Sequence, residues 1–183
     1  MDMQNIENQF TEVKSQLDTL NKKTAEDKCS LVVFSGDLDK AIAAFVIATG
    51  AVAMGMDAVM FFTFWGTPML RDKAKGVGGK DIMSKMFGAM LPKGTSQTKL
   101  SQMNMGGMGT AMMKSLMKKK NVASLEQFLE MSEELGVRIF VCEMTMDLMG
   151  FKREEIIDYK NLEFCGVARF LEEAANSKVQ LFI

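Results

Sequence analysis

The sequence contains no histidine, and this absence excludes several kinds of active site. Without an imidazole there is no Ser-His-Asp triad, no Cys-His dyad and no histidine-ligated zinc. Cysteine is scarce as well, with only Cys29, Cys142 and Cys165, far apart in the chain. Three such residues build neither a disulfide scaffold nor a four-cysteine metal site. We therefore expect reduced thiols in a cytoplasm and no bound metal.

Long apolar runs are also missing. The longest uncharged runs, 41–56 and 58–70, fall short of the ~18–20 residues that a membrane-spanning helix needs. The first ten residues are acidic and amide-rich, where a secretory signal needs a cationic and then an apolar stretch. We interpret the two runs as a buried helix followed by a buried strand.

The composition is that of a globular protein, but its charge is unevenly distributed. Of the 183 residues, 48% are hydrophobic and 25% charged, enough for one domain with a sizeable core. The net charge of −1 gives no reason to expect a nucleic-acid partner. Residues 65–120, however, carry 11 basic and 2 acidic side chains and ten of the 19 methionines. Both flanking parts of the chain are acidic.

We call residues 66–120 the Met/Lys-rich segment and interpret it as an insertion or lid, because it has few branched apolar residues to pack. A basic segment can attract anionic ligands, an acidic protein or a membrane surface. It can equally be no more than a solvated lysine-rich face.

Apolar residues at heptad spacing predict an amphipathic helix over about residues 3–23, within an N-terminal part that we bound at 1–28. They are Ile6, Phe10, Val13, Leu17 and Leu20. A seam this short does not hold a coiled coil together alone, so the helix must pack against its own domain or against another subunit.

Residues 29–183 alternate between strand and helix patterns and predict one α/β domain. Continuous apolar runs at 30–34, 58–64 and 137–142 are typical of parallel strands buried on both faces. Further strands are expected around Phe164 and at 178–183, and helices at 38–54, 124–135 and 167–175. The pattern indicates an open, mainly parallel sheet of about five strands with helices on both faces, whose functional crevice lies at the carboxyl ends of the strands.

Cysteine is the only strong nucleophile type expected at that edge. Cys142 ends a strand and precedes a helical turn, where backbone amides can favour a thiolate. Glu143 beside it acts in the opposite direction, and a small buried hydrophobe is an equally good interpretation of Cys142. On balance we expect a solvent-reachable thiol. Cys165 has a similar setting and is either an auxiliary thiol or a packing residue.

Two loops from the neighbouring strands should meet the cysteines. Gly36 and Asp37 follow the first strand, and we interpret Asp37 as the N-cap of the next helix, with a magnesium ligand as a weaker alternative. Trp65 follows the second strand and forms either a pocket wall or part of the core.

The loop at Gly106 and Gly107 precedes a lysine-rich helix and predicts an anion-binding or partner-binding surface with Lys114 and Lys118. It matches no nucleotide-binding motif. The methionines of this helix fit an adaptable contact surface better than a copper site.

Several stretches resemble the DsrE/DsrF-like sulfur-relay family, and within it the second DsrE-type branch, often labelled as peroxiredoxin-family proteins. The matching stretches are 35–41, 61–66, 103–109, 118–125 and 142–150. The resemblance covers about residues 30–183 and leaves out the N-terminal helix. The peroxiredoxin label is not supported, because no cysteine here lies in a PxxxTxxC pattern.

The resemblance implies a flavodoxin-like fold, trimeric or hexameric packing, and sulfane sulfur carried on Cys142 as a persulfide or thiosulfonate. Transfer by thiol exchange requires no cofactor. The implied partner is a small sulfur-carrier or rhodanese-type protein. Two alternatives stay open: a non-catalytic oligomeric binding module, peripheral to a membrane or not, and a flavodoxin-like domain that binds a nucleotide or other ligand.

Overall fold

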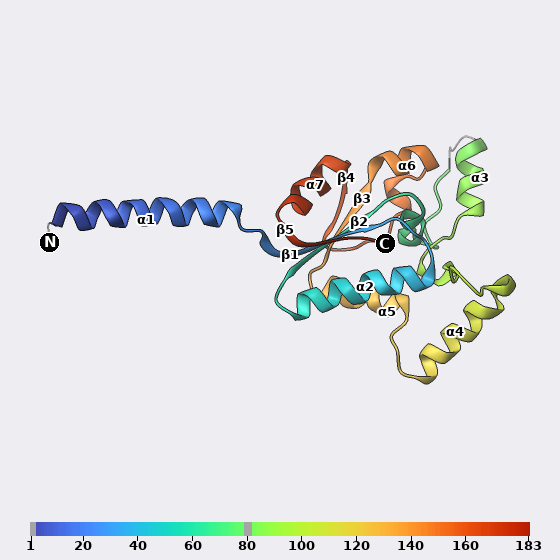
Figure 1. Ribbon diagram of the computed structural model, residues 1–183. Coiled ribbons are helices and arrows are strands. Elements are labelled where there is room, and N and C mark those ends of the chain that lie inside the picture. The colour runs from blue at the N-terminus through green and yellow to red at the C-terminus, as the bar shows by residue number, and fades with distance from the viewer. Residues whose placement is uncertain (1–2, 79–81) are drawn as a thin grey trace.

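The computed structural model describes residues 3–78 and 82–183 and contains one open sheet of parallel strands (Figure 1). The strand order is β4-β3-β2-β1-β5. The strands are β1 (Glu26–Val33), β2 (Asp57–Phe62), β3 (Arg138–Cys142), β4 (Leu162–Cys165) and β5 (Ser177–Phe182). Because all pairs are parallel, the carboxyl ends of the strands lie at one edge. The predicted open α/β sheet, consistent with a flavodoxin-like fold, is confirmed.

Helices cover both faces of the sheet, and the path of the chain decides which helix covers which face. From β1 to β4 the chain steps across the sheet in one direction, and α2 (Leu38–Ala53) and α5 (Leu125–Glu134) cover one face. The connection from β4 to β5 returns to the far side of β1. Since crossovers are right-handed, its helix α7 (Val167–Ala175) lies on the opposite face, as Figure 1 shows.

The main core lies between the sheet and α2 with α5. Small side chains of α2 (Ala41, Ala44 and Ala48) let this helix approach the sheet closely, and Phe45 packs 6.1 Å from the Phe62 ring. The start of α5 has a capping box, formed by Ser124 and Gln127.

A second, smaller core lies on the other face beneath α7. Phe170 of α7 stacks on Phe61 of β2 with the ring centroids 5.0 Å apart. The buried members of this cluster are Val59, Phe61, Phe140, Cys142, Cys165, Phe170 and Ala174. Two of the three cysteines therefore face α7.

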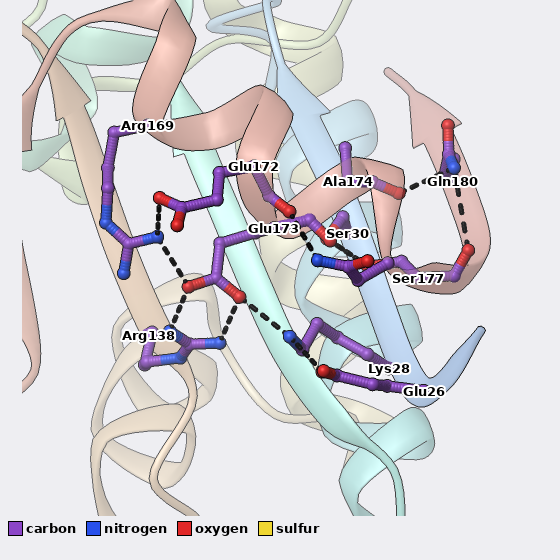
Figure 2. Close-up of polar contacts among 11 residues, drawn as sticks. Glu26, Lys28, Ser30, Arg138, Arg169, Glu172, Glu173, Ala174, Ser177 and Gln180 are labelled. Atoms are coloured by element: carbon purple, nitrogen blue, oxygen red, sulfur yellow. Dashed lines mark hydrogen bonds and ion pairs between the residues drawn. The ribbon is translucent and has the colours of Figure 1, made fainter. Parts of the chain in front are cut away.

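A network of charged side chains fixes the far end of α7 to the sheet (Figure 2). Glu173 accepts hydrogen bonds from Arg138 at 2.6 and 2.8 Å and from Lys28 at 2.8 Å. Arg169 pairs with the same carboxylate at 2.8 Å. Hydrogen bonds from Arg138 hold the pKa of Glu173 at about 2 against the effect of burial, and Lys28 acts in the same direction.

The Met/Lys-rich segment lies around the carboxyl edge and contains more regular structure than the sequence predicted. The turn η1 (Phe64–Leu70) leads into it, and its described residues then form α3 (Ile82–Met90), η2 (Thr95–Gln97), η3 (Met105–Gly107) and α4 (Met108–Lys119). Helix α3 was not predicted, and β2 ends earlier than expected because Phe64 turns the chain with a φ of +43°.

A buried ion pair attaches this segment to the rest of the chain. Arg71 lies 3.2 Å from Glu155 in the turn η4 (Arg153–Glu155), covers the Phe151 ring, and donates a hydrogen bond to the carbonyl of Gly88 in α3. Helix α3 also packs on α6 (Glu143–Met149), where Gly150 leaves room for Ser84.

Helix α1 (Met3–Lys23) projects away from the amino-end side of the sheet (Figure 1). The side chains of Ile6, Phe10, Val13 and Leu17 are 49–70% exposed. The predicted helix is confirmed, but these residues of its apolar seam do not pack on its own domain. Leu20, the last residue of the seam, lies in a part of α1 whose side chains the structure does not describe.

Candidate functional site

The carboxyl edge of the sheet holds the four loops that the sequence predicted there. Adjacent strands bring the segments together in the order Cys165, Cys142, Trp65 and Gly36 along this edge. They do not form one common pocket, however. The loops after β1 and β2 line an open groove, whereas the two cysteines lie inside the small core under α7.

Cys142 and Cys165 are direct partners in the register of β3 and β4. Side chains at paired positions of neighbouring strands point to the same face, so both thiols face α7 within one cluster. Both cysteines are free and buried, with exposed fractions of 3% and 6%. The expected solvent-reachable thiol at position 142 is therefore wrong for this conformation, because Phe140 and Phe170 pack in the same cluster.

The surroundings of Cys165 disfavour its thiolate. Burial raises the pKa of the Cys165 thiol to about 11, and the carboxylate of Glu163 acts in the same direction. Burial also raises the pKa of Cys29, which lies in β1 toward its amino end and belongs to the core on the other face of the sheet. The Glu143 side chain is 44% exposed and pairs with Arg153.

The groove after β1 and β2 has a volume of about 790 Å³. Trp65 is 48% exposed and forms part of its wall, which favours a pocket wall over a core position. A Cβ on Gly36 would lie 2.3 Å from the carbonyl oxygen of Trp65, so only glycine lets the two loops touch. The lining residues are Phe34, Ser35, Gly36, Asp37, Lys40, Trp65, Ala89, Met90, Leu91, Pro92, Gln97 and Lys99.

Asp37 occupies the N-cap position of α2, as predicted, but its side chain forms no capping hydrogen bond. Its carboxylate instead accepts a hydrogen bond from Ser35 at 2.8 Å and pairs with Lys40 at 3.0 Å. Among the described residues, no three cysteine, aspartate or glutamate side chains are grouped so that they could hold a metal ion.

Thr145 is a residue of this edge that sequence reasoning missed. It is fully buried in α6, and its hydroxyl lies 3.0 Å from that of Thr63 and accepts a hydrogen bond from the Phe64 amide at 3.0 Å. These contacts join the helix that follows Cys142 to the end of β2. Only the pairing of β2 with β3 brings the two threonines together, so no local pattern could have revealed them.

In the loop at Gly106 and Gly107, backbone amides already donate hydrogen bonds within the loop itself. The amides of Gly107 and Gly109 both donate to the carbonyl of Asn104, and Gly106 and Gly107 have positive φ. Lys114 donates to the carbonyl of Ser96 at 2.8 Å.

Lys118 lines a separate cavity of about 460 Å³ bordered by α4 and α5, and Lys114 also contributes to this wall. Neither Gly106 nor Gly107 is among the residues that line it. The four predicted residues therefore do not form one anion cradle.

The fold and the residues at the carboxyl edge of the sheet define a class of protein. It is an open parallel α/β protein of flavodoxin-like type, with a cysteine at the carboxyl end of an inner strand. Comparison with known families narrows this class. A model of the DsrE/DsrF/DrsH-like family matches residues 25–182. The chain belongs to this family, as the resemblance of its motifs indicated.

Two relatives match nearly their whole lengths. The chain is 44% identical over 156 residues to Uncharacterized protein YrkE of Bacillus subtilis (strain 168), a match that covers 85% of this chain and 96% of that protein. It is 35% identical over 170 residues to Sulfur carrier protein DsrE2 of Allochromatium vinosum, covering 86% of this chain and 99% of that protein. Within the described ranges, every helix is too short or too polar to span a bilayer.

Proposed function

We propose that this protein is a sulfur-relay protein that carries sulfane sulfur on Cys142, as a persulfide or thiosulfonate, and passes it to an acceptor thiol. The observation that carries the proposal is the position of Cys142, at the carboxyl end of β3 in a chain related to a named sulfur carrier. A thiol is the chemical group that such transfer requires, because sulfur moves by attack of one thiolate on the sulfur held by another.

Loading of Cys142 requires an opening, since the side chain is 3% exposed. The first turn of α7 is the part of its cover best suited to move. Gly166, the N-cap of α7, makes no capping hydrogen bond, and Val167 is 57% exposed. The other end of α7 is held by Glu173. The helix can therefore open at the cysteine end while it stays attached at the far end.

The acceptor that we propose is a small sulfur-carrier or rhodanese-type protein, in a cytoplasm where thiols stay reduced. The Met/Lys-rich segment supplies a surface for it. The exposed stripe of α3 includes Met90 at 76%, and that of α4 includes Met112 at 65%. Methionine adapts to varied partners, and the excess of lysine favours an acidic one.

The test is intact-mass spectrometry after brief incubation with polysulfide or thiosulfate, followed by alkylation. We expect one added sulfur or thiosulfonate group on the wild type, its absence in Cys142→Ala, and its retention in the matched control Cys29→Ala. Loading is also measured in Cys165→Ala, in which no second thiol lies beside Cys142. If Cys142 gains nothing in any of these proteins, the proposal is wrong.

The exposed methionines favour a second candidate, a non-catalytic binding module. A module peripheral to a membrane should cosediment with anionic vesicles in a salt-sensitive way. Met112→Gln should then weaken binding, whereas Met54→Gln, which alters an 81% exposed methionine at the end of α2, should not. Binding of this kind without any cysteine adduct would favour the second candidate over sulfur relay.

A further inference from the structure

We propose that Cys165 is the resolving thiol of Cys142: it attacks the persulfide on Cys142, closes an internal disulfide and expels the terminal sulfur as sulfide. This inference rests on the proposed function and adds a second reacting residue to it: the internal step competes with transfer to an acceptor thiol and discharges a persulfide that no acceptor has taken. Its basis is the pairing of the two cysteines on neighbouring strands, within one buried cluster.

The geometry suits a direct bond. Neighbouring strands lie about 4.8 Å apart, and disulfides form between Cα atoms that are about 4.4–6.8 Å apart. Cys142 and Cys165 are directly opposite in register and face the same helix, so their sulfur atoms can meet without a change of strand pairing. Cys29 faces the core on the other side of the sheet and cannot take part.

The surroundings of Cys165 disfavour its direct loading. Burial and Glu163 keep Cys165 protonated at neutral pH, which makes it a poor site for loading from an external sulfur donor. Attack on a neighbouring persulfide also proceeds through the Cys165 thiolate, but the reacting groups are held together, and the high effective concentration offsets the small thiolate fraction. Cys165 therefore reacts after Cys142 has been loaded.

The step is balanced within the protein. A bond forms between Sγ of Cys165 and Sγ of Cys142, and the bond from Sγ of Cys142 to the terminal sulfur breaks. The Cys165 sulfur is oxidised from the thiol to the disulfide level, and the terminal sulfur is reduced to sulfide. The proton of the Cys165 thiol leaves with the sulfide. A dithiol reductant must then supply two electrons to restore both thiols.

The experiment loads the full-length protein anaerobically with polysulfide, removes the excess, and follows released sulfide and alkylatable thiols over time. We expect the wild type to release one sulfide per chain and to lose two alkylatable thiols, which dithiothreitol restores. Peptide mapping should join residues 142 and 165. Cys165→Ala should retain the persulfide, with sulfide release slower by about tenfold or more. Cys29→Ala should behave like the wild type.

Cys165→Ser repeats the test with a side chain of similar size, in case the alanine variant folds poorly. If the wild type keeps its persulfide as long as both Cys165 variants do, and no internal disulfide forms, the resolving role is wrong while the relay function stands. If Cys142 is never loaded in any variant, the relay function fails and this inference fails with it.

Discussion

Glu173 shows how a single residue can hold a whole helix in place. Glu173 is 6% exposed, and its carboxylate meets three cations, from β1, β3 and α7 itself. The hydroxyl of Ser177 donates to the Glu173 carbonyl at 2.8 Å and accepts from Ser30 at 2.7 Å, so the next strand is attached at the same point (Figure 2). Removing this charge takes the carboxylate away from Arg138 and leaves the buried Lys28 with the exposed carboxylate of Glu26.

We expect Glu173→Gln to lower the free energy of unfolding by about 3 kcal/mol, because Lys28 and Arg138 lose the buried carboxylate that they share. Glu172→Gln is the matched control, since that side chain is 71% exposed and its change should stay within about 0.5 kcal/mol. Urea denaturation measures both. Equal effects of the two substitutions would contradict the anchoring role.

The low pKa of Glu173 predicts that the stability of the folded protein depends on pH. The folded pKa of Glu173 is about 2, below the ordinary value of 4.5, so its contribution is complete above pH 4.5 and is lost as the pH falls toward 2. We expect the wild type to lose stability over this interval more steeply than Glu173→Gln does. Parallel acid titrations followed by circular dichroism would show no difference between the two proteins if the charge played no part.

At the scale of elements, α7 covers the cysteines and is fixed more firmly at one end than at the other. Its first turn begins at Gly166, whose φ of −82° suits any residue and whose Cβ position is free of neighbours within 4 Å. A serine there can accept a capping hydrogen bond from the first turn, worth about 0.4 kcal/mol relative to glycine. Such a cap should make the opening of the first turn of α7, which exposes Cys142, less favourable.

We therefore expect Gly166→Ser to slow the loading of Cys142 by polysulfide about twofold, which corresponds to about 0.4 kcal/mol. Gly50→Ala is the matched control, because it adds about 1 kcal/mol to an exposed site in α2 whose Cβ position is also free. The rate of Cys142 loading is measured by mass spectrometry on samples that are quenched at successive times. If both variants load as fast as the wild type, the sulfur donor reaches Cys142 by another route.

At the scale of the molecule, apolar side chains lie outside the cores on the seam of α1 and on the edge strand β5, where Phe182 is 70% exposed, as well as on the methionine stripes of α3 and α4. A helix with so short a seam is only marginally stable by itself in water, and an exposed apolar edge strand can pair with a strand of another chain. We expect a second copy of the chain to cover α1, in line with the oligomer that the family resemblance implies.

Phe10→Glu should shift the solution mass toward the monomer in light scattering coupled to size-exclusion chromatography, because it puts a charge in the middle of the seam. Asn8→Glu adds the same charge on the opposite side of α1 and should leave the mass unchanged. The unfolding midpoint of the α/β domain should change little in either variant when both are compared as monomers. An unaltered oligomer mass in Phe10→Glu would show that α1 is not its interface.

The sequence by itself determined the elements and the edge at which the chemistry is sought. Apolar runs gave the inner strands, the heptad spacing gave α1, and parallel pairing follows from strands that alternate with helices. These features are local, so they can be read along the chain. The turn at Phe64 and the helix α3 escaped prediction, because a positive φ and contacts with distant residues decide them.

Only the tertiary structure decided that Cys142 and Cys165 lie side by side, buried, and apart from the groove at Trp65. Sequence periodicity does not say which strands pair or which face a returning helix covers. Here β4 pairs with β3, and the return from β4 to β5 carries α7 across the face where both thiols point. The physical reason is that strand pairing and crossover handedness are properties of the whole sheet, set by contacts between residues far apart in the chain.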